Sequence, residues 1–221
     1  AALWANKNLF TVDEKGKLET VAGVPPDYFS PTGQLWGNPL YRWKEMEQDD
    51  FLWMRNRFAH LFTMVDIVRI DHFRGFEAFW EIPGNAKTAE KGKWIKAPGH
   101  KLFKSIKNHL GDVPILAEDL GVITPAVEKL RDDFEFPGMK ILQFAFGTDM
   151  ETKFLPHNFV QNCVVLTGAH DNDTTRAYFE NAKLDKEADI YDHVQKYLNY
   201  FWDDIVPELI RAAYASVANI V

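Results

Sequence analysis

The chain has 221 residues, of which 46% are hydrophobic and 14% are aromatic, and its formal net charge is −7. This composition is typical of a globular protein with a sizeable core and one or two domains. The acidic balance argues against nucleic acid as a partner, because phosphate binding requires clustered Lys and Arg. No apolar run approaches the ~20 residues needed to span a bilayer, so a membrane is not expected as a partner either.

The single cysteine, Cys163, lies in an apolar run and is expected to be a small buried hydrophobic residue. A lone cysteine forms no intramolecular disulfide, which favours a cytoplasmic protein. The chain opens on Ala1, without a basic and apolar signal segment. We expect the true N-terminus to be missing, so a plastid location stays open beside the cytoplasmic one.

The first 48 residues differ in pattern from the rest, so the chain divides into regions 1–48 and 49–221. Residues 9–24 are predicted to form a β-hairpin, because two β-like runs flank a polar turn. The stretch 23–43 is dense in Pro, Gly and aromatic residues but lacks periodic spacing. Ordinary linkers are not this aromatic, so this stretch is expected to be a structured binding loop.

Region 49–221 alternates strands with helices, beginning with helical apolar spacing over 49–63. The elements predicted after this helix are a strand ending at Asp71, a helix near 101–110, a strand ending at Glu118, a helix opened by Thr124 and Pro125, strands over 139–144 and 163–167, and a helical tail from about 186 onward. Such alternation indicates an α/β fold with a parallel sheet. Four units make about half of a (β/α)8 TIM barrel of ~250 residues, so we expect an open sheet or part of a barrel.

The first of three acidic segments at strand ends contains Asp71. Arg69 and Asp71 are two residues apart on one strand, so their side chains point to the same face of the sheet. In a barrel this face is the interior, where a carboxylate must be paired or functional, and Arg69 would favour its ionised form. A structural ion pair at a strand end is the alternative for this short motif alone.

The other two acidic segments are Glu118-Asp119 and His170-Asp171-Asn172-Asp173. Glu118 and Asp119 point to opposite faces, and taken alone they are equally compatible with charges that solvate a loop. A His, two acids and an amide directly after a buried strand are costly unless they bind something. The remaining histidines have no metal-ligand spacing, so no metal is expected; His72 is the one that could join the site, because it adjoins Asp71.

Aromatic residues recur beside these acids, and those in 23–43 lack the spacing of core residues. Aromatic rings pack against the apolar C–H faces of pyranose sugars, whereas sugar hydroxyls bind carboxylates and amides. Acids that converge from separate strands at one end of a barrel are what glycosidic-bond chemistry requires. A nucleotide-binding protein is disfavoured, because no glycine-rich phosphate motif follows any predicted strand.

Six segments, in order along almost the whole chain, resemble the 4-α-glucanotransferases of glycoside hydrolase family 77, also called amylomaltases or disproportionating enzymes. They are residues 23–30, 33–41, 69–75, 117–121, 136–140 and 170–174. The long segments rich in Pro, Gly and aromatic residues are far more specific than any single acidic triplet. The chain departs from the family pattern at Ala169, where the family usually has Thr, and it is expected to lack the first and last strands of the barrel.

The resemblance implies part of a (β/α)8 barrel with a long inserted substrate-binding loop. It also implies retaining transfer of α-1,4-glucan segments between maltooligosaccharides, in the metabolism of starch, glycogen and maltodextrin. By motif, Asp71 is the implied nucleophile, Glu118 the general acid/base and Asp171 the third acid. The implied substrate-binding residues are Arg69, His72, His170, Asp27, Tyr28, Phe29, Gln34 and Trp36.

In the implied mechanism, Glu118 protonates the departing glycosidic oxygen while Asp71 attacks the anomeric carbon. A sugar hydroxyl, deprotonated by Glu118, then takes the glycosyl group from the covalent intermediate. This mechanism predicts carboxyl groups about 5–5.5 Å apart and a raised pKa for Glu118. No cofactor is implied.

Two alternatives remain beside glucan transfer. One is an α-glucan hydrolase on the same scaffold, which differs in having water as the acceptor. The other is a catalytically incomplete fragment that binds glucans without turnover. A partial barrel exposes sheet edges and an apolar face, so self-association through these edges is also expected.

Overall fold

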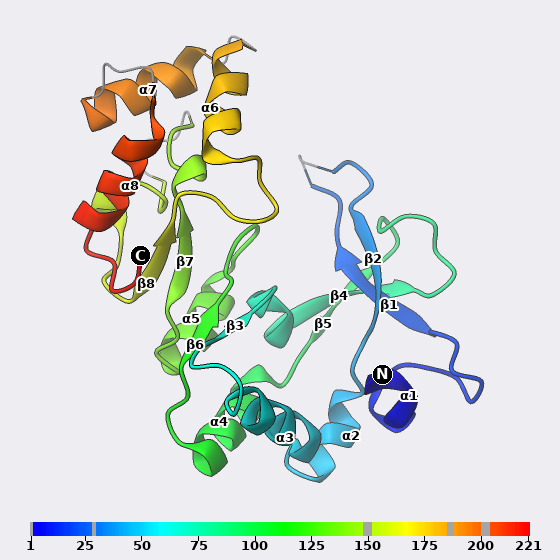
Figure 1. The fold of residues 1–221 in the computed structure, drawn as a ribbon. Coiled ribbons are helices and arrows are strands. Elements are labelled where there is room, and N and C mark those ends of the chain that lie inside the picture. The colour runs from blue at the N-terminus through cyan, green and yellow to red at the C-terminus, as the bar shows by residue number, and fades with distance from the viewer. Residues whose placement is uncertain (1, 28–29, 148–151, 185–187, 200–203) are drawn as a thin grey trace. The chain divides into compact units, whose positions relative to one another are not determined.

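The structure is a computed structural model that describes residues 2–27, 30–147, 152–184, 188–199 and 204–221 (Figure 1). The chain forms two compact units, Ala1–Phe134 and Glu135–Val221. Both contain helices and strands, so the expected α/β content is confirmed. The expected division into regions 1–48 and 49–221 rests on the sequence pattern and stays a prediction. In the part of the chain that the structure describes, every helix is too short or too polar to cross a membrane.

The first unit contains a four-stranded antiparallel sheet in the order β2-β1-β4-β5 (Figure 1). Its strands are β1 (Thr20–Val24), β2 (Gln34–Pro39), β4 (Ala78–Pro83) and β5 (Lys93–Lys96). Gly23 allows β1 and β2 to approach closely, because a Cβ there would lie 2.2 Å from the carbonyl oxygen of Gln34. The expected loop over 23–43 therefore contains a strand, β2, which pairing with β1 stabilises despite its exposed side chains.

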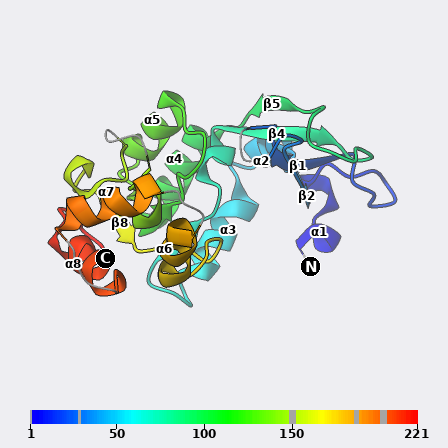
Figure 2. The same cartoon turned by 90° about the horizontal axis from the view of Figure 1, so that it is seen from above.

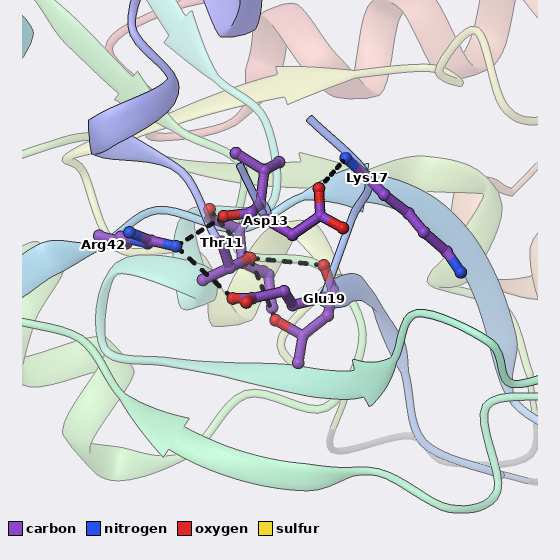
Figure 3. Close-up of polar contacts among 8 residues, drawn as sticks. Thr11, Asp13, Lys17, Glu19 and Arg42 are labelled. Atoms are coloured by element: carbon purple, nitrogen blue, oxygen red, sulfur yellow. Dashed lines mark hydrogen bonds and ion pairs between the residues drawn. The ribbon is translucent and has the colours of Figure 1, made fainter. Parts of the chain in front are cut away.

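The hairpin expected over 9–24 forms only in part. Figure 3 shows the polar contacts around its turn, with Asp13, Lys17 and Arg42 among the labelled residues. Val12 makes an isolated antiparallel bridge across the polar turn, and the Lys17 backbone N–H donates to Asp13 Oδ1 at 2.8 Å. Arg42 donates from Nη2 to the Val12 carbonyl oxygen at 2.7 Å, which fastens the turn to the start of α2 (Trp43–Gln48). The hairpin ends there, because β1 pairs with β2 and β4 instead.

A parallel pair of strands, β3 (Val68–Ile70) and β6 (Ile115–Ala117), lies in the same unit. The helices of this unit are α1 (Ala2–Ala5), α2 (Trp43–Gln48), α3 (Leu52–Leu61), α4 (Gly99–Leu110) and α5 (Pro125–Asp133). Short 3₁₀ turns, Lys7–Leu9 and Phe73–Phe76, complete it. The predictions for α4 and α5 are confirmed: Gly111 follows α4 with φ 78°, and Pro125 opens α5.

Apolar side chains of the parallel pair, of α4 and of α5 are buried. Phe73, which follows β3, is fully buried and stacks on Phe103 of α4 at a ring separation of 5.6 Å. Ile106 of α4, Ile115 of β6 and Val127 of α5 are each at most 2% exposed. Burying these side chains stabilises the strand ends that carry the acids.

The second unit is built on another parallel pair, β7 (Gly138–Ile141) and β8 (Cys163–Leu166). Its helices are α6 (Thr175–Leu184), α7 (Ala188–Leu198) and α8 (Val206–Ala215), as Figure 2 also shows from above. Cys163 is buried in a cluster that includes Phe146, Phe179 and Leu209, which confirms its expected role as a hydrophobic residue. β7 ends earlier than predicted, because the chain turns into a 3₁₀ helix (Leu142–Phe144).

Candidate active site

The two carboxylates expected to act as nucleophile and acid/base follow neighbouring parallel strands. β3 and β6 are paired so that Ile70 lies opposite Ala117. Asp71 and Glu118 are the next residues of the two segments, so they occupy equivalent positions at the same end of the pair. Because adjacent strands are about 4.8 Å apart, both side chains start from neighbouring backbone positions. The fold thus brings these two acids together within the first unit.

Glu118 is held by backbone hydrogen bonds at both carboxyl oxygens. The His72 N–H donates to Oε2 at 2.6 Å, and the Leu120 N–H donates to Oε1 at 2.7 Å. Burial raises the pKa of Glu118 and the charge of Asp71 raises it further, whereas the two hydrogen bonds and Arg69 oppose this change. The net direction is upward, as expected for a group that must donate a proton.

Asp71 is paired with Arg69 as their spacing predicts, with Arg69 Nη2 lying 2.8 Å from Asp71 Oδ1. The Asp71 side chain is nevertheless 73% exposed, so the expectation of a buried carboxylate is wrong for the described chain. Asp71 follows the last residue of β3 and lines an open cavity, where solvent reaches it. An ion pair this exposed adds little to folding stability.

His72 adopts the left-handed conformation, with φ 48° and ψ 54°. Non-glycine residues rarely adopt it, and here it accompanies the hydrogen bond from the His72 N–H to Glu118. The imidazole packs edge-on against Trp36 at a ring separation of 4.7 Å. Burial lowers the pKa of His72 to about 4, Arg74 lowers it further and Asp71 opposes the change. His72 is therefore neutral at pH 7.

A cavity of about 670 Å³ adjoins Asp71 in the first unit. Arg69, Asp71, His72 and Trp36 line it, together with aromatic residues that include Tyr41, Trp43, Phe76 and Phe79. This wall combines a few polar groups with flat apolar rings, as the walls of ligand pockets do.

The predicted binding residues in β2 and in the loop before it divide into three groups. Trp36 is 39% exposed and donates from Nε1 to Gln34 Oε1 at 3.0 Å. Asp27 accepts a hydrogen bond from the Ser30 N–H at 2.8 Å, which closes a turn. Tyr28 and Phe29 lie outside the described residues. Gln34 and Trp36 thus contact each other, and Trp36 lines the cavity, whereas Gln34 and Asp27 are not among its lining residues.

His170 and Asp171 lie in the second unit, in the loop after β8. Their side chains are 70% and 77% exposed, and His170 Nε2 lies 3.4 Å from Asp171 Oδ2. The loop is closed by reciprocal contacts: the Asn172 N–H donates to the Ala169 carbonyl oxygen at 3.1 Å, and the Ala169 N–H donates to Asn172 Oδ1 at 3.3 Å. The two predicted residues are therefore presented to solvent at the end of a buried strand.

Two contacts that support these acidic loops were not predicted from the sequence. Arg131 of α5 forms an ion pair with Asp119, which is 1% exposed, so Asp119 is a structural anchor beside Glu118. Gln143, also 1% exposed, donates from Nε2 to the Asp173 carbonyl oxygen at 2.9 Å. Neither residue belongs to a motif with recognisable spacing, so the sequence carried no signal for these contacts.

Comparison with known proteins assigns the chain to a family. The family model of the 4-α-glucanotransferases, glycoside hydrolase family 77, matches residues 1–221. A 4-α-glucanotransferase of Thermus thermophilus is 55% identical over 190 residues, which are 85% of this chain and 38% of the relative. A chloroplastic/amyloplastic 4-α-glucanotransferase of Solanum tuberosum is 49% identical over 221 residues, which are 100% of this chain and 38% of the relative.

A solved structure agrees with these sequence relatives. The amylomaltase from Streptococcus agalactiae, in complex with acarbose, has a TM-score of 0.91 and 39% identity to this chain, covering 98% of it and 43% of the amylomaltase chain. The chain therefore belongs to the 4-α-glucanotransferase family, glycoside hydrolase family 77. It spans about two fifths of the length of the relatives that it matches.

Proposed function

We propose that this protein transfers α-1,4-glucan segments between maltooligosaccharides with retention of configuration. The observation that carries the proposal is the register of β3 and β6, which puts Asp71 and Glu118 at equivalent positions on adjacent strands. A strand spacing of about 4.8 Å suits the ~5–5.5 Å carboxyl separation of retaining enzymes. Membership of the 4-α-glucanotransferase family supports the same reaction class.

We assign the roles of the three acids from the family resemblance, and the surroundings of Glu118 and Asp71 support them. Glu118, whose pKa is raised by burial, donates a proton to the leaving oxygen and later accepts one from the incoming sugar. Asp71, exposed on the cavity wall and paired with Arg69, attacks the anomeric carbon. Asp171 binds sugar hydroxyls and stabilises the transition state, with His170 beside it. These roles presuppose a (β/α)8 barrel, of which this chain is one part.

Transfer exceeds hydrolysis only if a sugar occupies the place from which water would attack. Trp36, held by Gln34 and in contact with His72, offers a flat apolar surface at the cavity for an acceptor glucan. We assign the residues around Trp36, including Asp27, Tyr28 and Phe29, to this acceptor side. Because the family includes both bacterial and plastid proteins, we infer a cytoplasmic or plastid location.

The test is mass spectrometry of the products that the full gene product forms from maltotriose. We expect a ladder of shorter and longer glucans, because the glycosyl group passes to sugar acceptors. Replacement of the nucleophile, Asp71→Asn, is expected to abolish the ladder, with a loss of at least about 10³-fold in kcat.

The control is Asp112→Asn, an exposed carboxylate of another loop, which should leave the ladder intact. Glucose and maltose without longer products would replace the transfer proposal with hydrolysis. Maltotriose that is bound but unchanged would mean that the protein binds glucans without turnover.

A further inference from the structure

Three consecutive residues after β3 donate hydrogen bonds to the segment that carries Glu118. The His72 N–H donates to Glu118 Oε2 at 2.6 Å, and the Phe73 N–H donates to the Glu118 carbonyl oxygen at 3.0 Å. Arg74 Nη1 donates to the carbonyl oxygen of Val122. We call residues 72–74 the clamp. It holds both ends of the loop 118–122, so the segment after Asp71 fixes the segment after β6.

Arg74 is an unusual residue at this position, because it is only 7% exposed. Its guanidinium carbon lies 3.9 Å from the ring centroid of Trp94 in β5, so the charge is stacked on an aromatic face. Burial lowers the pKa of Arg74, and Glu77 opposes this change. Among the described residues, Arg74 Nε is buried without a hydrogen-bond partner.

A buried arginine with an unsatisfied nitrogen is costly for folding, so Arg74 points to a role other than stability. The reason lies in where the side chain ends. It reaches the backbone of Val122, which is beyond Gly121, a residue with φ 77°. Without Arg74, the loop loses its bond at Val122, and the buried pair of Asp119 and Arg131 holds it on the opposite side of the chain from Glu118.

We propose that Arg74 is a positioning residue of the reaction, which acts by holding the loop 118–122 so that Glu118 stays bonded to the His72 N–H beside Asp71. The proposal rests on the proposed function of Glu118 as acid/base. Arg74 also connects the antiparallel sheet to the segments that carry the acids, because Trp94 of β5 supports its guanidinium. Arg74 is not among the residues that line the cavity, so its effect on the reaction is indirect.

The sign of the expected pH effect follows from the groups around Glu118. Hydrogen bonds from His72 and Leu120 favour the ionised carboxylate, as does Arg69, whereas burial and Asp71 favour the protonated acid. Release of the clamp removes one hydrogen bond and so raises the pKa of Glu118. Simple opening of the loop to solvent would do the reverse, because it would relieve the effect of burial.

The experiment is the pH profile of kcat for maltotriose transfer in the full gene product and in Arg74→Met. We expect kcat to fall about tenfold to a hundredfold with KM within about twofold, because substrate binding is untouched while the acid is misplaced. The basic limb of the profile should move to higher pH. Arg74→Lys keeps the charge and a donor, and it should recover part of kcat.

Two further variants serve as a milder disruption of the same contact and as a control. Trp94→Leu removes the ring under the guanidinium but leaves Arg74, so the basic limb of its pH profile should also move to higher pH, by a smaller amount. This variant still tests the proposal if Arg74→Met folds poorly. Arg211→Met makes the same exchange at an exposed arginine of α8 and should match the parent protein. Folded Arg74→Met and Trp94→Leu proteins with parental profiles, or with the limb moved to lower pH, would overturn the proposal.

Hydrogen–deuterium exchange separates this inference from the proposed function. Faster exchange of peptide 116–124 in Arg74→Met than in Arg211→Met is expected whether or not glucans are transferred. Absence of transfer by the parent protein would refute the proposed function alone. Unchanged exchange of this peptide would refute the clamp, whatever the activity.

Discussion

Single residues at the site are tuned by opposing influences. Glu118 combines burial, which favours its protonated form, with two backbone donors that favour the anion. His72 provides one of these donors through a left-handed backbone and keeps a neutral ring against Trp36. The nucleophile candidate and the acid candidate thus differ in solvation although they follow adjacent strands, which is the arrangement that separates the roles of two carboxyl groups.

Glu118→Gln tests the role of the acid. The rate of glycosidic cleavage should fall as pH rises through the pKa of Glu118, which burial raises above its usual range, because only the protonated form donates. The variant should lose this basic limb and about 10²–10⁴-fold in kcat for maltooligosaccharides. Fluoride leaves without protonation, so cleavage of a glucosyl fluoride should be affected much less. Glu14→Gln, at an exposed turn, is the matched control, and equal losses on both substrates would contradict the assignment.

The lowered pKa of His72 predicts that the stability of the protein depends on pH. Its pKa falls from 6.5 to about 4 on folding, so the unfolded chain binds a proton more readily between these values. Stability should therefore decrease as pH falls from 6.5 to 4, by up to about 3 kcal/mol from this group. His72→Asn, which tolerates the left-handed backbone, should reduce the decrease; urea unfolding at pH 7 and pH 4.5 measures it. An equal decrease in both proteins would show that other groups cause it.

At the level of elements, close packing between neighbouring segments holds the loop that carries Asp171 and Asp173. Gln143, in the 3₁₀ turn after β7, bonds the Asp173 carbonyl oxygen and packs against Gly168, which follows β8. A Cβ at Gly168 would lie 2.9 Å from Gln143 Oε1 and 3.0 Å from its Cδ. Glycine is thus required there for space, since no unusual φ is involved.

Gly168→Ala is accordingly expected to displace Gln143 and destabilise the protein by about 1–3 kcal/mol, as overpacking does. Denaturant unfolding monitored by circular dichroism measures the change. Gly147→Ala is the control, because nothing lies within 4 Å of a Cβ at that position, and surface changes stay within about 0.5 kcal/mol. Equal stabilities of the two variants would contradict the packing argument.

Elements with local signals were predictable, and those that depend on distant partners were not. α4 follows from apolar periodicity and a closing glycine, and β8 from a short apolar run ending in a polar turn. β2, β4 and β5 lack such signals: all the side chains of β2 except Pro39 are exposed, and pairing with β1 or with one another determines them. α2 is also short, and Arg42, at its N-cap position, makes no capping hydrogen bond with its side chain.

For the molecule as a whole, self-association stays a prediction. In the second unit, Ile210 and Tyr214 of α8 are 45% and 72% exposed and lie one helical turn apart on the same face. Such an apolar patch favours contact with a second copy. Sedimentation velocity should detect species larger than the monomer that diminish in Ile210→Lys/Tyr214→Lys. Trp4→Lys replaces a residue of the first unit that is 71% exposed, and it should leave the larger species unchanged. If the parent protein sediments only as a monomer, the prediction is wrong.

The sequence by itself determined the family, the α/β class and which residues carry acidic or aromatic chemistry, because these depend on residue types and short spacings. Only the tertiary structure decided which groups surround each acid. The His72 N–H, the buried Arg74 and the pair of Asp119 and Arg131 reach the Glu118 loop from segments 12 to 48 residues away. No local pattern encodes such contacts, since they arise when packed strands and helices bring distant backbone and side-chain groups within hydrogen-bonding distance.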